Sequence, residues 1–215
     1  MTPAFDDLPV PLPAGCAGAR VVGDPSGLVE AFAWPTELSG AAESRRSDFL
    51  MGRLAAVEAL RRLGAEGSVG RSADGAPVWP EGIAGSLTHH SGVAAAIVGR
   101  GTGGLGIDIC PRLDGDRLRA VQRQCLTESE REQWAGEESA TLAFAAKESI
   151  YKAAYPRAQR FIGFAEAEIV SVDDGRWTAR ISASLAEEVG VDTVAGTYGW
   201  DGSLLYAVVA LEGPR

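Results

Sequence analysis

The order of predicted elements constrains the fold of this 215-residue chain most, because a long helix followed by short apolar strands occurs twice. The first helix is predicted over about residues 36–63 and ends at Gly64. Its apolar residues recur at helical spacing: Phe49, Leu50, Leu54, Val57, Leu60 and Leu63. The second helix is predicted over Ser139–Ala154, with Pro156 ending it. Although no exact repeat is visible, the pattern predicts an α+β fold made of two similar halves.

Short strands are predicted wherever a run of apolar residues is bounded by turn signals. They lie at about residues 19–22, 28–34, 83–88, 93–98 and 105–110. The last third predicts two hairpins, at 168–182 about Asp174-Gly175 and at 193–211 about Asp201-Gly202. Shorter helices are predicted at 118–125, at 185–189 and after Thr127, which forms a capping box with Glu130.

Composition and charge exclude several classes of protein. The chain has 29 Asp+Glu against 20 Lys+Arg, a formal net charge of −9, which argues against a general nucleic-acid binder. Its longest apolar run, Val93–Val98, is far shorter than the roughly 20 residues of a membrane span. The acidic, proline-rich N-terminus lacks a secretory signal, and the three cysteines (Cys16, Cys110 and Cys125) are not spaced as CxxC. We therefore expect a cytoplasmic protein with reduced thiols that binds neither membrane nor nucleic acid.

Lysine is scarce in this sequence, and its placement draws attention to one segment. The two lysines among the 20 basic residues are Lys147 and Lys152, and both lie close to Glu148. A bias toward arginine codons or an ordinary helix ion pair would explain them. Alternatively, they remain lysine because arginine, a permanently charged planar fork, cannot replace a compact cation that also gives up a proton.

Carboxylates at two places could together bind a metal ion. Asp108 and Cys110 share one face of the strand at 105–110, and Glu148 and Lys152 share one face of the second helix. Carboxylate oxygens suit Mg²⁺, which keeps several waters and is completed by substrate phosphates. A neighbouring lysine would neutralise charge on a phosphoryl group. The alternative is structural: a helix ion pair of about 0.3–0.5 kcal/mol and an aspartate at the end of a strand.

Two further segments suggest phosphate or nucleotide chemistry. His89 ends a predicted strand within the turn sequence SLTHHSG, where it could donate to phosphate oxygens beside backbone N–H groups. A turn histidine without a role is the alternative. GTGGLG at 101–106 matches GxGxxG, but it precedes a strand instead of opening a helix, so we interpret it as a turn.

Four motifs, taken in order, resemble those of the 4′-phosphopantetheinyl transferases, of the broad-specificity type associated with siderophores and polyketides. They are RRSDFLMGRLAAVEALRRLG from Arg45, GAPVWPEGIAGSLTHHSG from Gly75, GIDIC from Gly106 and FAAKESIYKA from Phe144. Gly163-Phe164 is similar to the start of the family's following strand. The resemblance implies an α+β fold of two halves, 1–104 and 105–215, related by a pseudo-two-fold axis, with the active site in the cleft between them.

The resemblance also implies a reaction, in which coenzyme A and an apo carrier protein give a phosphopantetheinyl carrier and adenosine 3′,5′-bisphosphate. Asp108 and Glu148 would hold Mg²⁺, Glu148 would accept the serine proton, and Lys152 would stabilise the transferring phosphate. His89 joins Glu148 and Lys152 as the third catalytic residue that the resemblance implies. The implied coenzyme contacts are Arg45 and Arg53 at the 3′-phosphate, with Arg46 as an alternative, and Thr88, His89, Lys147 and Lys152.

The sequence departs from the family's pattern at two positions. Cys110 stands where the family has a second acidic residue, and a thiol is a poor ligand for Mg²⁺, so a water would have to take its place. Asp74 precedes Gly75 where related sequences often carry a basic residue that reaches the coenzyme; Arg71 could compensate.

Acidic carrier proteins are the partners that the resemblance implies for a chain that we expect to be a monomer. Basic residues near the predicted helix at 118–125 could dock an acidic helix: Arg112, Arg117, Arg119 and Arg123. A solvated helix face is the alternative.

Two other functions stay open. One is a Mg²⁺-dependent phosphoryl-transfer enzyme or phosphohydrolase that needs no carrier. The other is a catalytically silent coenzyme- or carrier-binding protein, for which Cys110 argues.

Overall fold

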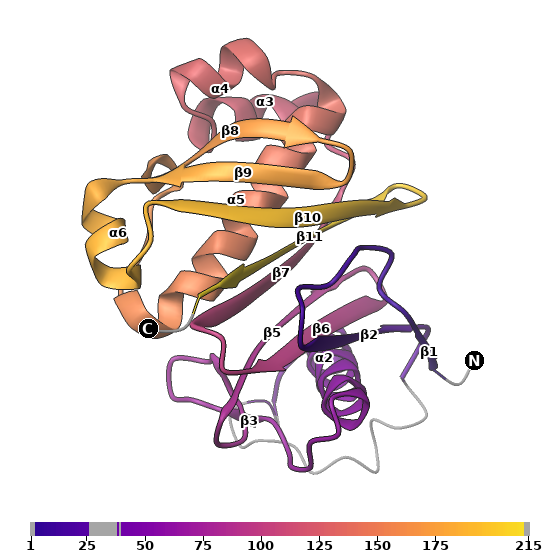
Figure 1. The fold of residues 1–215 in the computed structure, drawn as a ribbon. Coiled ribbons are helices and arrows are strands. Elements are labelled where there is room, and N and C mark those ends of the chain that lie inside the picture. The colour runs from indigo at the N-terminus through magenta and orange to yellow at the C-terminus, as the bar shows by residue number, and fades with distance from the viewer. Residues whose placement is uncertain (1–2, 26–37, 39, 213–215) are drawn as a thin grey trace.

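Two units, each an antiparallel sheet with a long helix against it, build the molecule (Figure 1). The structure is a computed structural model that describes residues 3–25, 38 and 40–212. The elements before Gly104 are β1 (Ala4–Asp6), β2 (Cys16–Val22), α2 (Glu43–Arg62), β3 (Gly70–Arg71), β4 (Pro77–Val78), β5 (Ile83–His90) and β6 (Val93–Arg100).

The second unit contains the remaining elements, and its sheet has five strands where that of the first unit has four. They are β7 (Gly104–Pro111), α3 (Gly115–Gln124), α4 (Glu128–Gln133), α5 (Glu137–Ala158), the 3₁₀ turn η2 (Phe164–Glu166), β8 (Ala167–Asp173), β9 (Arg176–Ile181), α6 (Ala183–Val189), β10 (Thr193–Asp201) and β11 (Leu204–Leu211). The first sheet has the order β1-β2-β6-β5 and the second β7-β11-β10-β9-β8, while β3 and β4 form a separate hairpin.

Helix α2 packs on the first sheet mainly through small side chains. Ala55, Ala56 and Ala59 are fully buried against β2 and β6, and Leu60 lies beside them. Alanine lets the helix approach the sheet closely, since it fills little space and loses no side-chain entropy. Val57, expected on the buried face, is 50% exposed, so the prediction was wrong at that residue.

Helix α5 lies directly on β7, and two glycines of that strand make the contact possible. A Cβ atom at Gly106 would lie 1.8 Å from the carbonyl oxygen of Ser149, and one at Gly104 would lie 2.1 Å from that of Ala153. No side chain fits at these distances. The two glycines therefore bring α5 close to the strand that carries Asp108, which positions the site described below.

A third core lies between the two sheets, on the faces opposite to α2 and α5. Ile97 of β6, Ile107 of β7 and Tyr206 of β11 are fully or almost fully buried in it. The segment before β2 closes this core: Val10 is buried within it, and Thr197 of β10 donates a 2.6 Å hydrogen bond to the carbonyl oxygen of Pro11. The N-terminal segment thus joins the first unit to the second (Figure 1).

Most predicted elements are confirmed, often with longer bounds. The strands at 19–22, 83–88, 93–98 and 105–110, both hairpins, the short helices and the Thr127–Glu130 capping box are present. The strand expected at 28–34 and residues 36, 37 and 39 of the first expected helix lie outside the described residues. Residues 40–42 are described and are not helical, so this helix begins at Glu43, later than expected. Among the described residues, no helix is long and apolar enough to cross a membrane.

Three further local predictions were wrong. Pro156 lies inside α5, which continues to Ala158, because a proline in the last turn removes only one hydrogen bond. Gly163-Phe164 opens a 3₁₀ turn, and the strand begins later at Ala167. SLTHHSG is mostly strand, since β5 continues through His90 and the turn consists of Ser91 and Gly92.

Candidate active site

Asp108 on β7, Lys152 on α5 and Thr88 on β5 meet at the boundary between the two units. The Lys152 ammonium donates to Asp108 Oδ1 at 2.7 Å and to the carbonyl oxygen of Ile107 at 2.9 Å. The Thr88 hydroxyl donates to the same carboxylate oxygen at 3.2 Å. Asp108 is 8% exposed, so these donors replace the water that a buried carboxylate has lost. The predicted strand and helix therefore meet here, and Lys152 is the helix residue that bonds Asp108.

Glu148 lies one helical turn before Lys152, close enough to Asp108 to interact with it. Burial raises the pKa of the Glu148 carboxyl, the Asp108 charge raises it further, and Lys152 opposes both. Burial also raises the pKa of the Cys110 thiol to about 12, with Asp108 adding to the effect. The site thus holds two carboxyl groups that repel each other beside a thiol that stays protonated.

This donor set fits a hard divalent cation held by two protein ligands. A cation between Asp108 and Glu148 would remove the repulsion that raises the pKa of Glu148. Cys110 adds no oxygen, and no group of three or more His, Cys, Asp or Glu side chains converges anywhere in the part of the chain that the structure describes. Water and substrate oxygens would complete the coordination, as is usual for Mg²⁺.

Lys147 does not face this site. Its ammonium lies buried and donates to Glu130 Oε2 at 2.6 Å and to the carbonyl oxygens of Cys125 and Phe164, each at 2.9 Å. An ammonium has three hydrogens, and all three are used here. The geometry contradicts the expected coenzyme contact, because none is left for a phosphate.

A basic pocket of about 180 Å³ lies between α2, β5 and the β3–β4 hairpin. Arg45, Arg53, Arg71 and His89 line it, whereas Arg46 is not among the lining residues. Burial lowers the pKa of Arg53, and the nearby charge of Arg71 lowers it further. Two guanidinium groups that repel each other in one pocket are arranged to bind an anion.

The positions of Arg53 and His89 follow from their neighbours. The Arg53 guanidinium stacks 4.5 Å from the centre of the Phe49 ring and donates to the carbonyl oxygen of Gly70 at 2.8 Å. His89 Nδ1 lies 3.6 Å from Asp48 Oδ2, and the side chain is about half exposed. The structure therefore brings together Arg45, Arg53 and His89 as expected and adds Arg71, which the sequence only suggested.

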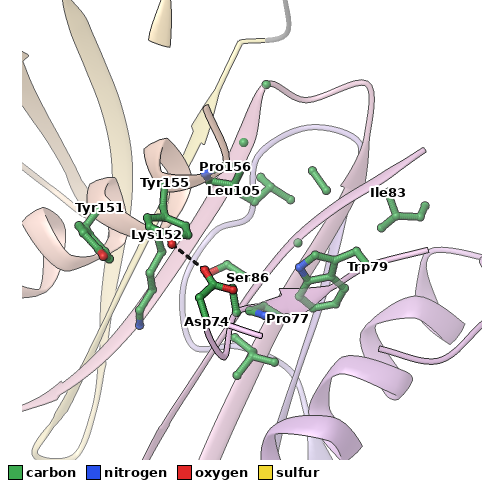
Figure 2. Close-up of a pocket in the computed structure, with 16 residues that line it drawn as sticks. Asp74, Pro77, Trp79, Ile83, Ser86, Leu105, Tyr151, Lys152, Tyr155 and Pro156 are labelled. Atoms are coloured by element: carbon green, nitrogen blue, oxygen red, sulfur yellow. Dashed lines mark hydrogen bonds between the residues drawn. The ribbon is translucent and has the colours of Figure 1, made fainter. Parts of the chain in front are cut away.

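A larger cavity of about 570 Å³ is lined by residues of both units (Figure 2). Trp79 and Ser86 contribute from the first unit, and Leu105, Lys152 and Tyr155 from the second. Pro77 and Leu87 line both this cavity and the basic pocket, so the two are adjacent. Residues of both units thus share one cavity beside Lys152.

A third hollow, of about 240 Å³, lies beside Glu148 and was not predicted from the sequence. Tyr151, Phe161, Ile162 and Phe164 line it, and Phe161 is 77% exposed. Phe161, Ile162 and Phe164 are separated from Glu148 by the last turns of α5 and the following loop, and only the aromatic residues near Gly163 indicated this hollow. An apolar slot next to the carboxylates would suit an uncharged chain of the substrate.

The four arginines expected to dock a partner lie on and just before α3. Arg112 bonds Glu138 at 2.5 Å and stacks 4.9 Å from the Trp200 ring, and Arg119 pairs with Asp116. Arg117 lies close enough to Cys110 to oppose the rise in its pKa. No residue of α3 is buried, so this basic helix lies on the surface near the two carboxylates.

Two family models match the chain in succession. The 4′-phosphopantetheinyl transferase N-terminal domain matches residues 34–99, and the 4′-phosphopantetheinyl transferase superfamily matches residues 104–198. The two matches meet near the start of β7, which is also the boundary between the two units of the structure.

Individual relatives match over most of the chain. The 4′-phosphopantetheinyl transferase Npt of Nocardia iowensis is 36% identical over 172 residues, which are 76% of this chain and 77% of the relative. PptT of Mycobacterium tuberculosis is 33% identical over 184 residues, 80% of this chain and 79% of the relative. Enterobactin synthase component D of Escherichia coli is 34% identical over 140 residues, 63% of this chain and 66% of the relative. Since both of its units match and two of these relatives align with it over 77% and 79% of their own length, this chain belongs to the 4′-phosphopantetheinyl transferase superfamily.

Proposed function

We propose that this protein transfers the 4′-phosphopantetheine group of coenzyme A to a serine of an apo carrier protein and releases adenosine 3′,5′-bisphosphate. One observation carries the proposal. Lys152 lines a cavity shared by both units and bonds Asp108, which interacts with Glu148, and a pocket of arginines adjoins that cavity. This arrangement supplies an acidic centre for a metal and a basic pocket for a phosphate. Coenzyme A carries phosphate groups at two separate points, the pyrophosphate and the 3′-phosphate, which these two sites would bind.

The coenzyme would lie in the cleft between the units. Its 3′-phosphate enters the basic pocket, where Arg45, Arg53 and Arg71 offer several N–H donors, and His89 adds one more. Its pyrophosphate lies next to Lys152 and the carboxylates. The pantetheine arm is uncharged, and the apolar slot beside Glu148 suits it.

Asp108 and Glu148 would hold Mg²⁺, which supplies charge to stabilise the pyrophosphate during transfer. The Thr88 hydroxyl donates to Asp108 at 3.2 Å and would help to keep that carboxylate in place, while its contact with the coenzyme stays a prediction. Cys110 stays a neutral thiol and leaves its side of the site to water.

Glu148 is the group that we assign to accept the proton of the attacking serine, directly or through a water, because Asp108 already accepts hydrogen bonds from Lys152 and Thr88. The serine oxygen forms a bond to the β-phosphorus, and the bond from that phosphorus to the bridging oxygen breaks. Lys152 lines the cavity and also bonds Asp108, so its charge lies where it stabilises the phosphate of the leaving bisphosphate. The electron pair of the broken bond remains on the bisphosphate.

The proposed domain organisation follows the same boundary. Residues 1–104 and 105–215 would be two related halves, and a helix packed on an antiparallel sheet in each of them supports a pseudo-two-fold relation. That the protein works as a cytoplasmic monomer stays a prediction from the sequence.

Carrier-dependent product release tests the proposal against its alternatives. With coenzyme A, Mg²⁺ and an apo carrier protein, we expect adenosine 3′,5′-bisphosphate in amounts equal to the carrier modified. Release at the same rate without carrier would instead identify a phosphohydrolase. Coenzyme A binding with no product from any of several apo acyl and peptidyl carriers would identify a silent binding protein.

The surface of α3 is the proposed docking site for an acidic carrier protein, and charge reversal tests it. Arg117→Glu with Arg119→Glu should raise the KM for the carrier about three- to tenfold, since charges at the rim of an interface mainly steer association. The KM for coenzyme A should not change, because the basic pocket lies on α2 and the hairpin. Steady-state kinetics with each substrate varied in turn measures both constants.

A control with the same change in net charge is Arg61→Glu with Arg100→Glu, two exposed residues of the first unit. This control should leave both constants at their normal values. Equal effects of the α3 variant on the two substrates would contradict docking at α3.

A further inference from the structure

The β3–β4 hairpin bridges the two units through one hydrogen bond at its tip. The Tyr155 hydroxyl, on α5, donates to Asp74 Oδ2 at 2.6 Å (Figure 2). The Ser72 hydroxyl donates to the other oxygen of the same carboxylate. Tyr155 lies three residues after Lys152, so this contact connects the hairpin to the helix that carries Lys152 and Glu148.

The base of the hairpin is held by the first unit. Arg53 of α2 donates to the carbonyl oxygen of Gly70, the first residue of β3. The hairpin therefore has one attachment to the helix of each unit. The hairpin is short: its strands pair Gly70 with Val78 and Arg71 with Pro77, and the Ser72 N–H at its turn donates to the carbonyl oxygen of Ala76 at 2.9 Å.

The turn at the tip controls where Arg71 lies. Gly75 has a φ of +94°, and a Cβ atom there would lie 2.8 Å from the Arg71 guanidinium. The guanidinium thus packs directly on the turn that contains Asp74 and reaches the basic pocket from it. A movement of the turn would move Arg71 with it.

We propose that the Tyr155–Asp74 hydrogen bond positions Arg71 for the 3′-phosphate of coenzyme A, which makes Tyr155 a positioning residue for the coenzyme. This inference rests on the function proposed above for the basic pocket. The 3′-phosphate and the pyrophosphate are joined through one ribose, so their separation varies little. The basic pocket that holds the 3′-phosphate and the helix α5 that faces the pyrophosphate must therefore keep a matching distance. The Tyr155–Asp74 hydrogen bond fixes that distance.

Calorimetry with the full chain tests this inference on two ligands, coenzyme A and 3′-dephospho-coenzyme A. Tyr155→Phe should raise the Kd for coenzyme A about fivefold, as expected for a lost hydrogen bond to a charged group at a partly exposed site. The Kd for the dephospho ligand should stay within about twofold of the unchanged protein, because Arg71 has no phosphate to hold. A general loss of structure would weaken both ligands alike.

Two further variants complete the test. Asp74→Ala should weaken coenzyme A binding as Tyr155→Phe does, and the double variant should be no weaker than either single one, because both remove the same contact. Tyr198→Phe removes a hydroxyl from β10, away from the cavity, and should bind both ligands normally.

Three results would overturn the inference: unchanged coenzyme A binding by Tyr155→Phe, equal losses on the two ligands, or independent losses from Tyr155 and Asp74. The readout needs no turnover. If no carrier is modified, the proposed transferase function is contradicted. The ratio of the two dissociation constants still decides whether the Tyr155–Asp74 hydrogen bond affects binding of the 3′-phosphate.

Discussion

Replacing Glu148 with glutamine is expected to lower kcat for carrier modification by about 10²- to 10⁴-fold, the usual contribution of a positioned general base. Glutamine keeps the size of the side chain but accepts no proton and brings no negative charge to the site. The loss should appear in kcat, because Glu148 acts on the reacting groups. The Kd for coenzyme A without metal should change little, since the basic pocket is lined by other residues.

Glu137→Gln is the matched control for this variant. It makes the same chemical change on the same helix, at an exposed residue of the first turn of α5. We expect normal kcat from it in the same carrier assay. A Glu148→Gln protein that keeps kcat within tenfold of normal would contradict the role given to this carboxylate.

The largest expected effect on stability comes from Lys147. Lys147 and Glu130 form a buried ion pair whose side chains are 1% and 0% exposed. Glu130 also accepts hydrogen bonds from the backbone N–H groups of Thr127 and Ile169. Lys147→Met leaves this carboxylate buried without its cation, so the free energy of unfolding should fall by about 3–5 kcal/mol in urea titrations.

A double variant keeps this prediction testable if the single one folds poorly. Lys147→Met with Glu130→Leu removes both charges and should recover part of the loss, since apolar replacements of a whole buried pair are often tolerated. Arg61→Met, at an exposed ion pair with Glu58, should unfold at a normal urea concentration. A loss below about 1 kcal/mol for Lys147→Met would show that the pair contributes little to the fold.

Lys147 and Lys152 occupy different environments in the structure, and the sequence could predict only part of this difference. Five residues along a helix correspond to a rotation of about 500°, so Lys147 and Lys152 point roughly 140° apart. The sequence could therefore establish that they do not share a face. Which face meets β7 depends on Gly104 and Gly106, through a contact between segments that are more than 40 residues apart in the chain.

Local patterns predicted the elements well because their causes are local. Apolar runs bounded by turns predicted β5, β6 and β7, and the Thr127 capping box predicted the start of α4. The exposure of Val57 was missed, since the buried face of α2 is made largely of alanines, which give little hydrophobic contrast. The motifs located Asp108, Glu148 and Lys152, but the pairing of Thr88 with Asp108 and of Tyr155 with Asp74 required the fold.

Intact-mass spectrometry of an apo carrier protein tests the central claim most directly. The carrier is incubated with this protein, coenzyme A and Mg²⁺, and in a parallel sample with EDTA added. We predict a gain equal to one phosphopantetheine per carrier that EDTA prevents. An unchanged carrier mass across several acyl and peptidyl carriers, with coenzyme A bound and Mg²⁺ present, would contradict the account.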